Sequence, residues 1–191
     1  MPKKGGKVVL MNAKTIIVTG KVRLAYCNIW QPRVSKDDED GNKKPKYSAM
    51  ILIPKDDMET QLMIKEAVEA AYQEGITGEC ILKGNASKAP TLGAIHTPLR
   101  DGDEEHPGED PFADHMFLNA TKSKRPDIFD INKDDIEDEE EVYSGCYARV
   151  RLNFYPYNTK GGKGIAVSLW AIQKVADGEP LSKTSKNKDF F

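Results

Sequence analysis

The sequence has few of the residues and none of the motifs that usually carry catalysis or cross a membrane. The histidines are His96, His106 and His115, and none has the spacing of a zinc protease or a zinc finger. Nucleophile-elbow and P-loop motifs are also missing. No apolar run approaches the roughly 18 residues that span a bilayer. These absences predict a protein that is not an enzyme, is not embedded in a membrane, and uses no cofactor and no metal.

Cysteine is also scarce. Cys27, Cys80 and Cys146 are odd in number and scattered, without a CxxC spacing. This pattern argues against a disulfide framework and a cysteine zinc site, and it favours free thiols. The basic start, residues 1–7, lacks the apolar stretch of a signal peptide. We therefore expect the protein to work in the cytoplasm.

The charge is close to balanced overall but strongly segregated. Residues 101–114 contain seven acids and no Lys or Arg, and residues 127–141 contain nine acids and one Lys. These segments carry −7 and −8, so a formal total of −2 leaves +13 on the rest of the chain. A near-neutral total is therefore compatible with a polyanionic partner, because local fields decide binding. The acidic segments are interpreted as solvated loops, although competition with such a polyanion for a basic groove stays open.

Short apolar or alternating stretches, separated by polar loops, predict strands along most of the chain. In the stretch 19–33, alternation puts Lys21 and Arg23 on one face with Ala25 and Cys27, and it puts Tyr26 on the opposite face with Val22 and Leu24. The predicted strands cover residues 8–18, 19–33, 46–53, 116–121, 127–131, 142–156 and 164–175.

One long helix is predicted after Pro54. Asp56 or Asp57 caps its start, the helix runs to about Glu74, and Gly75 ends it. Its apolar stripe is expected to include Met58, Leu62, Ala67, Ala71 and Tyr72.

Together these elements predict a mainly β protein, a small β-barrel with one main α-helix and long loops. The expected organisation is a basic N-terminal segment with room for a short strand (1–17), a barrel domain (18–176) and a flexible C-terminal tail (177–191).

The most informative stretch is 147–157. Ala148, Val150, Leu152 and Phe154 form an apolar face for the core. The opposite face carries Tyr147, Arg149, Arg151, Asn153, Tyr155 and Tyr157. Flat rings stack on unpaired bases and cations follow phosphates, so this mixture is typical of single-stranded nucleic-acid binding. A solvated strand whose tyrosines lean on neighbouring loops would give the same pattern.

Basic and aromatic residues elsewhere favour the nucleic-acid interpretation. They cluster on one strand face, at the end of the first long loop, between two short strands, and in a glycine-rich hairpin that could close over DNA. These candidate contacts are Lys21, Arg23, Trp30, Arg33, Lys44, Lys46, Tyr47, Lys122, Lys124, Arg125, Lys160 and Lys163.

Two other functions remain open. Asp101, Asp103, Glu104 and Glu105 could hold a divalent ion, as in a metal-dependent nuclease. Such a run of acids is more often a solvated loop, which makes an enzyme the weaker hypothesis. The acidic segments could instead contact basic protein partners and make the barrel an adaptor.

Several segments, in one order over about residues 18–181, resemble phage-encoded single-stranded DNA-binding proteins with an OB fold. They are KYSAMILIP (46–54), PLRDGD (98–103), NATKSKRP (119–126), VYSGCY (142–147), GIAVSLW (164–170) and QKVADG (173–178). The resemblance implies a five-stranded barrel with a helix and no catalytic centre. It also implies single-stranded DNA as the partner, a role in phage replication, recombination and repair, and the host cytoplasm as the location.

The end of the chain departs from many replication proteins of this kind, whose tails are strongly acidic and tipped by an aromatic residue. Here Phe190 and Phe191 supply the aromatic tip, but residues 177–191 contain three acids and three lysines. Recruitment of replication proteins through Phe190 and Phe191 is therefore a weak hypothesis beside a floppy end. Exposed edges of an incompletely closed barrel also predict a homodimer.

Overall fold

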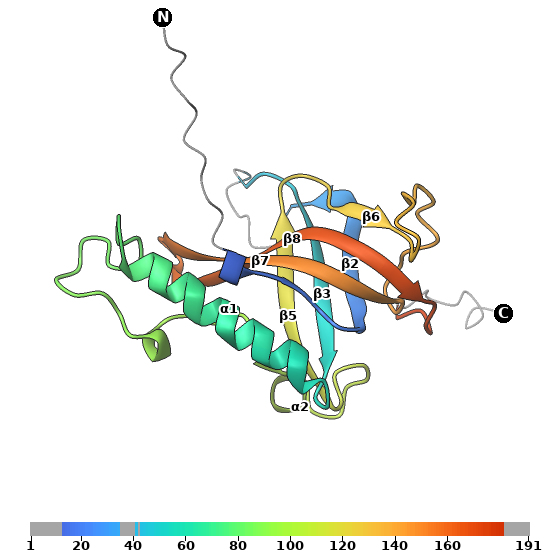
Figure 1. Ribbon diagram of the computed structural model, residues 1–191, viewed down its shortest axis with the longest axis horizontal. Coiled ribbons are helices and arrows are strands. Elements are labelled where there is room, and N and C mark those ends of the chain that lie inside the picture. Colours follow the sequence, from blue (N-terminus) through green and yellow to red (C-terminus); the bar gives the residue numbers. More distant parts are fainter. Residues whose placement is uncertain (1–12, 35–40, 42, 182–191) are drawn as a thin grey trace, which may run out of the picture.

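A computed structural model describes residues 13–34, 41 and 43–181 (Figure 1). The helices are α1 (Met58–Ile76) and α2 (Gly102–Glu105), with 3-10 turns at Ala13–Thr15 and Leu92–Ala94. The strands are β1 (Ile16–Val18), β2 (Val22–Arg33), β3 (Lys46–Pro54), β4 (Arg100–Asp101), β5 (His115–Lys122), β6 (Asp127–Phe129), β7 (Tyr147–Thr159) and β8 (Gly162–Ala176). Every predicted strand overlaps one of these. Residues 8–12 of the first predicted strand, and Phe190 and Phe191, lie outside the described residues.

Five strands close into a ring in the order β2-β3-β5-β8-β7. The pairs β2–β3, β3–β5, β7–β8 and β2–β7 are antiparallel, and β5 and β8 run in parallel. This closed ring with one main helix confirms the expected OB-like barrel. β1 extends the sheet beside β7, and β6 extends it beside β8.

The barrel interior is filled by alternate residues of its longest strands. On β7 the predicted apolar face, Ala148, Val150, Leu152 and Phe154, is at most 1% exposed. It meets an inward row on β8, which consists of Ile165, Val167, Leu169 and Ile172. Because side chains alternate along a strand, burying this row forces the polar and aromatic residues of β7 to the outside.

Helix α1 packs against the barrel through part of the predicted stripe, because Ala67 and Ala71 are buried and Tyr72 packs against the core. Asp57 caps it as expected, with the backbone N–H of Thr60 donating to Asp57 Oδ1 at 3.0 Å. The buried positions include Ile64, Ala67, Val68 and Ala71, whereas Met58 and Leu62 are 66% and 58% exposed. The prediction was wrong for Met58 and Leu62 because an amphipathic sequence does not say where the barrel lies.

Gly75 does not end α1, contrary to prediction, because the helix continues to Ile76. A Cβ atom at Gly75 would lie 2.6 Å from Leu82 Cδ1 and 2.8 Å from Pro156 Cβ. The glycine therefore allows the close approach of α1, the following loop and β7. Figure 1 shows the β7–β8 hairpin reaching this end of α1. No helix in the described part of the chain is long and apolar enough to cross a membrane.

A second hydrophobic cluster lies on the outer side of the barrel wall. Ala25 and Leu52 point away from the interior and pack against Phe112 and Phe117. The imidazole of His106 stacks on the Phe112 ring, with 4.0 Å between ring centroids. This cluster fixes residues 100–115 over part of the outer face of β3 and β5. The rest of that face stays accessible.

Candidate nucleic-acid interface

The outer face of β7 reaches solvent, as predicted. Arg149, Arg151 and Tyr155 are exposed, and Tyr157 is half-buried. Small residues lie opposite the tyrosines on β8, with Ala166 paired to Tyr155 and Gly164 to Tyr157. Partial burial raises the pKa of the Tyr155 hydroxyl, and the neighbouring Tyr157 adds to the shift. The phenol therefore stays neutral, which suits stacking on a base.

Two adjoining hollows run over the outer side of the barrel, and we call them together the outer groove. The first, of about 660 Å³, crosses β2, β3 and β5 and is lined by Tyr26, Asn28, Arg33, Val34, Lys43, Lys44, Lys46, Ser48, Ala49, Met50, Asn119 and Thr121. The second, of about 510 Å³, is lined by His96, Thr97, Pro98, Arg100, Asn119, Thr121, Tyr157, Ile165, Ala166 and Val167. Because Asn119 and Thr121 belong to both, the hollows form a continuous surface. In OB folds the face of the second and third barrel strands binds oligonucleotides, and here those strands are β3 and β5.

Tyr26 is the most exposed aromatic side chain in the outer groove, and the sequence prediction placed it on the wrong face. It is 64% exposed, and its backbone has φ = 45°. The β2–β3 register shifts between Ala25 and Asn28, which breaks the alternation assumed for residues 19–33. A left-handed backbone is uncommon outside glycine, and strain of this kind gathers at functional sites. No glycine or proline marks the bulge, so the sequence carries no signal for it.

The next residue holds the bulge in place. The backbone N–H of Cys27 donates to Ser144 Oγ at 3.0 Å. Burial raises the pKa of the Cys27 thiol to about 12, despite the opposing effect of the Ser144 hydroxyl. A neutral Cys27 therefore packs beside the core while Tyr26 faces out. Cys27, Cys80 and Cys146 are all free thiols, as predicted.

The structure separates the candidate contacts into several groups. Arg33, Lys44, Lys46 and Tyr157 line the outer groove. Lys122 and Arg151 approach the Trp170 ring, and Arg125 lies 4.5 Å from the centroid of Trp30. Tyr47, next to Lys46, is half-buried, and Lys124 and Lys160 are exposed in loops.

A separate group sits at the other end of β7. Lys21 and Arg23 lie 4.8 and 5.7 Å from the centroid of the Tyr147 ring. Arg23 also donates to the backbone oxygens of Gly145 and Glu179. These contacts give Arg23 a structural role in holding the chain after β8. Lys163 is similarly committed, because its ammonium group donates to the backbone oxygen of Lys83 at 3.2 Å.

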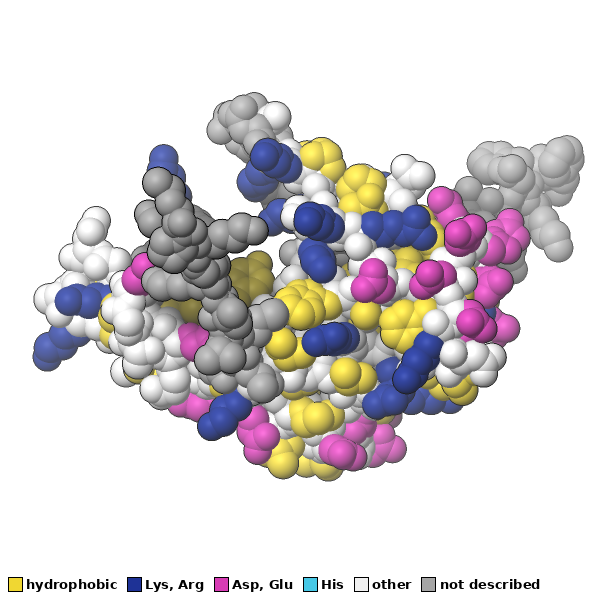
Figure 2. Space-filling model, turned by 45° about the horizontal axis from the view of Figure 1, so that its top comes forward, with side chains coloured by type: hydrophobic (Ala, Val, Ile, Leu, Met, Phe, Trp, Pro, Cys, Tyr) yellow, Lys and Arg dark blue, Asp and Glu magenta, His cyan; other side chains and the backbone are white. Residues whose placement is uncertain are grey.

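Figure 2 shows Lys and Arg side chains distributed among hydrophobic ones across the middle of the surface, with a few acidic side chains among them and a larger group at the right edge. On that side of Figure 1 the β6–β7 loop projects. Its acids from Asp134 to Glu141 are all exposed, as expected for a solvated loop. The loop is anchored by the buried Ile136 and Val142. The acidic run therefore borders the basic and aromatic surface without covering its middle.

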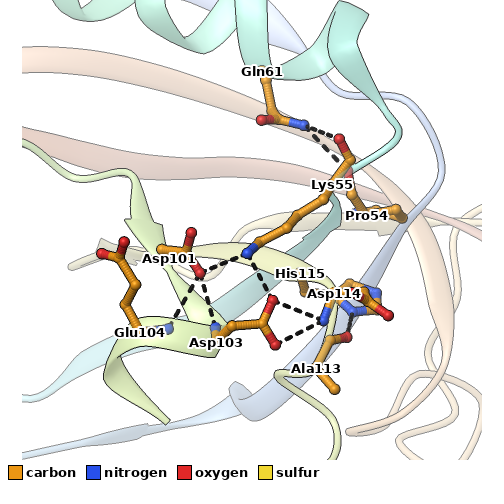
Figure 3. Close-up of polar contacts among 9 residues, drawn as sticks. All are labelled: Pro54, Lys55, Gln61, Asp101, Asp103, Glu104, Ala113, Asp114 and His115. Carbon is orange, nitrogen blue, oxygen red and sulfur yellow. Dashed lines mark hydrogen bonds and ion pairs between the residues drawn. The ribbon is translucent and has the colours of Figure 1, made fainter. Parts of the chain in front are cut away.

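The first acidic segment is organised around Lys55 (Figure 3). The Lys55 ammonium lies 2.8 Å from Asp101 Oδ1 and 2.7 Å from Asp103 Oδ2. Asp101 also caps α2, accepting hydrogen bonds from the backbone N–H groups of Asp103 and Glu104. In the described part of the chain, no three His, Cys, Asp or Glu side chains are grouped to hold a metal ion. A lysine thus stands between the carboxylates on which a nuclease site would depend.

Replacing Lys55 by methionine is expected to lower the melting temperature by a few degrees at pH 7 and much less in acid. Lys55 holds the pKa of Asp101 and of Asp103 below their usual range. The stabilisation is therefore complete above about pH 4, the ordinary pKa of Asp, and it is lost as the pH falls through the lowered values. Thermal unfolding followed by circular dichroism from neutral to acid pH measures this. A difference in melting temperature between the wild type and Lys55→Met that stays constant with pH would contradict this prediction. Lys65→Met is the control.

Comparison with known proteins gives consistent matches over most of the chain. The model of a family described as "Enterobacter phage Enc34, ssDNA-binding protein" matches residues 15–191. "Putative protein p50" of Acyrthosiphon pisum secondary endosymbiont phage 1 is 30% identical over 167 residues, which are 87% of this chain and 86% of that protein.

Two solved structures have the same fold. The single-stranded DNA-binding protein from bacteriophage Enc34, in complex with ssDNA, has a TM-score of 0.71 at 24% identity, with 89% of this chain and 91% of that chain covered. Gp2.5, a single-stranded DNA-binding protein encoded by bacteriophage T7, has a TM-score of 0.61 at 18% identity, with 90% and 97% covered.

Proposed function

Because this chain belongs to the family of the Enterobacter phage Enc34 ssDNA-binding protein, we propose that it binds single-stranded DNA without sequence preference during phage DNA replication. The observation that carries the proposal is the outer groove, which combines an exposed aromatic ring with cations along one continuous surface. Its principal members are Tyr26, Arg33, Lys44, Lys46 and Tyr157. The outer face of β7 adds Tyr155, which pairs with Ala166 of the second hollow, and Arg151. Arg149, whose Nε donates to the Thr19 oxygen at 3.2 Å, stays a predicted contact.

The groove suits unpaired strands better than duplex. Each base stacked on a flat ring contributes about 1–3 kcal/mol, and every base has such a face once the strand is single. In a duplex the base faces are covered by their neighbours, so Tyr26 would have only phosphates and base edges to contact. Asn28, Ser48, Asn119 and Thr121 line the same surface with neutral polar groups. They can bond to any base or sugar without selecting a sequence.

We infer that the groove binds DNA and does not cleave it, because the Lys55 ammonium pairs with Asp101 and Asp103, the carboxylates on which the nuclease hypothesis depends. We extend the proposal to recombination and repair, which also expose single strands, and to the cytoplasm of the host cell. We also propose that the protein forms a homodimer and that Phe190 and Phe191 recruit replication proteins. The remaining candidate contacts, among them Lys124, Arg125 and Lys160, stay predictions for the path of DNA beyond the groove.

A titration of labelled oligonucleotides, followed by fluorescence anisotropy, tests the function. We expect tighter binding to oligo(dT) than to duplex of equal length at matched salt. Its logarithmic salt slope is expected to be near −0.7 for each phosphate contact. Tyr26→Ala is expected to weaken single-strand binding by about 1–3 kcal/mol, and Tyr26→Phe much less, because the ring is kept.

The melting temperature serves as the control for this substitution. Tyr26 is largely exposed, so its loss is expected to leave the stability of the fold nearly unchanged. Equal affinity for single and double strands would contradict the proposal. Unchanged binding by Tyr26→Ala would remove this ring from the site.

A further inference from the structure

Trp170 has a position on the barrel that the sequence prediction did not single out. It lies on β8, where Leu169 pairs with Leu152 and Ala171 pairs with Arg151 of β7. Trp170 is therefore the extra residue of a β-bulge, between inward-facing Leu169 and small Ala171. Bulges re-aim side chains and are common beside functional sites. The indole is half-buried, so part of it reaches solvent.

Two cations from different strands flank this indole. The Lys122 ammonium on β5 lies 5.4 Å from the ring centroid, and the Arg151 guanidinium on β7 lies 5.2 Å from it. Among the described residues, none of the ion pairs includes Lys122 or Arg151. Both cations are on long side chains that can turn from the ring toward an anion.

The indole also lies close to the outer groove. Ser168, two residues before Trp170, pairs with Thr121 of β5, which lines both hollows. Trp170 itself is not among the lining residues of either hollow. The Trp170 surface is thus an extension of the outer groove across β8 toward β7.

We propose that Trp170, Lys122 and Arg151 form a subsite for one unpaired nucleotide. One base stacks on the indole, and the two cations move to the phosphates on either side of that base. The inference rests on the proposed function and adds a defined contact outside the outer groove. Stacking on tryptophan is tolerant of sequence because every base presents a π-face. The cations hold the ring in the free protein by cation–π contacts.

The chain contains two tryptophans, which allows a direct test by fluorescence. In Trp30→Phe, Trp170 is the only tryptophan. Binding of oligo(dT) is measured by the anisotropy of a labelled strand. As the anisotropy rises to saturation, the Trp170 emission is expected to fall in proportion. Inorganic polyphosphate at the same salt carries phosphates without bases and is expected to leave most of the emission. The reciprocal protein, Trp170→Phe, reports Trp30, whose indole N–H donates to the Val142 oxygen at 3.0 Å. Its emission reports the predicted Trp30 contact by itself, so that any change there is separated from the change at Trp170.

Affinity measurements complete the test. Trp170→Leu is expected to weaken oligo(dT) binding roughly 5- to 150-fold, and Trp170→Phe much less. Lys122→Gln and Arg151→Gln are each expected to reduce the logarithmic salt slope by about 0.7. If Trp30→Phe fails to fold, wild-type protein labelled with 5-fluorotryptophan gives the same information. The resonance of Trp170 is then expected to shift with oligo(dT), and the separate resonance of Trp30 reports the other indole independently.

The outcomes separate this inference from the proposed function. Normal anisotropy with unchanged Trp170 emission, and wild-type affinity in folded Trp170→Leu, would overturn the subsite and leave single-strand binding intact. Absence of an anisotropy change with any oligonucleotide would overturn the proposed function as well.

Discussion

Replacing Arg33, Lys44 and Lys46 together by glutamine is expected to weaken oligo(dT) binding about 100-fold at 0.1 M salt. All three side chains are exposed and line the same hollow of the outer groove. If each side chain contacts one phosphate, each contributes about 0.7 to the logarithmic salt slope. At this salt concentration, that contribution raises the affinity about fivefold. The slope itself is therefore expected to fall by about two. Anisotropy titrations at several salt concentrations give both quantities.

A matched variant controls for the loss of three positive charges. Lys65, Lys88 and Lys133 are exposed and line neither hollow. Their combined replacement by glutamine changes the net charge equally, and it is expected to leave the salt slope almost unchanged. If both triple variants lose affinity to the same extent, binding depends on overall charge, and the outer groove is not the site.

Phe112→Ala is expected to destabilise the protein by about 3–5 kcal/mol, the usual range for removing a buried phenylalanine. Phe112 is 1% exposed and packs against Phe117, with 5.3 Å between ring centroids, and against His106. It belongs to the second hydrophobic cluster, here called the outer cluster, which consists of Ala25, Leu52, Phe112 and Phe117. This cluster holds residues 100–115 against β3 and β5. Urea unfolding at neutral pH measures the loss.

The same substitution tests whether the outer cluster supports the groove. Arg100, which lines the second hollow and forms an ion pair with Glu105, lies in the segment that Phe112 anchors. Binding of oligo(dT) is therefore expected to weaken under conditions where Phe112→Ala is still folded. Leu62→Ala, at a side chain that is 58% exposed, is expected to change stability by less than about 0.5 kcal/mol. A loss below about 1 kcal/mol in Phe112→Ala would contradict a role in holding this segment.

Some parts of this surface were accessible from the sequence because they depend only on local alternation. On β7 a period of two residues separated the core row from the exposed row of arginines and tyrosines. The cap at Asp57 and the solvated acidic run after β6 were also predicted, since both follow from residue chemistry near one point in the chain.

Other parts depended on irregularities that no local pattern marks. A bulge turned Tyr26 to the outside of β2, and another placed Trp170 beside Ala171 on β8. Likewise, Lys55 is far in sequence from Asp101 and Asp103, and their ion pairs form because β3 and β4 both pair with β5. A cluster of acids that resembled a metal site was thereby found to be paired with a lysine.

By itself, the sequence determined the fold class, the exposed face of β7 and the resemblance to phage single-stranded DNA-binding proteins. Each of these rests on periodicity, residue type or the order of short segments. The tertiary structure alone decided which basic residues share the outer groove, which face of α1 is buried and which aromatic rings reach solvent. The physical reason is that closing the barrel brings distant strands into register, and that register sets which side chains are neighbours.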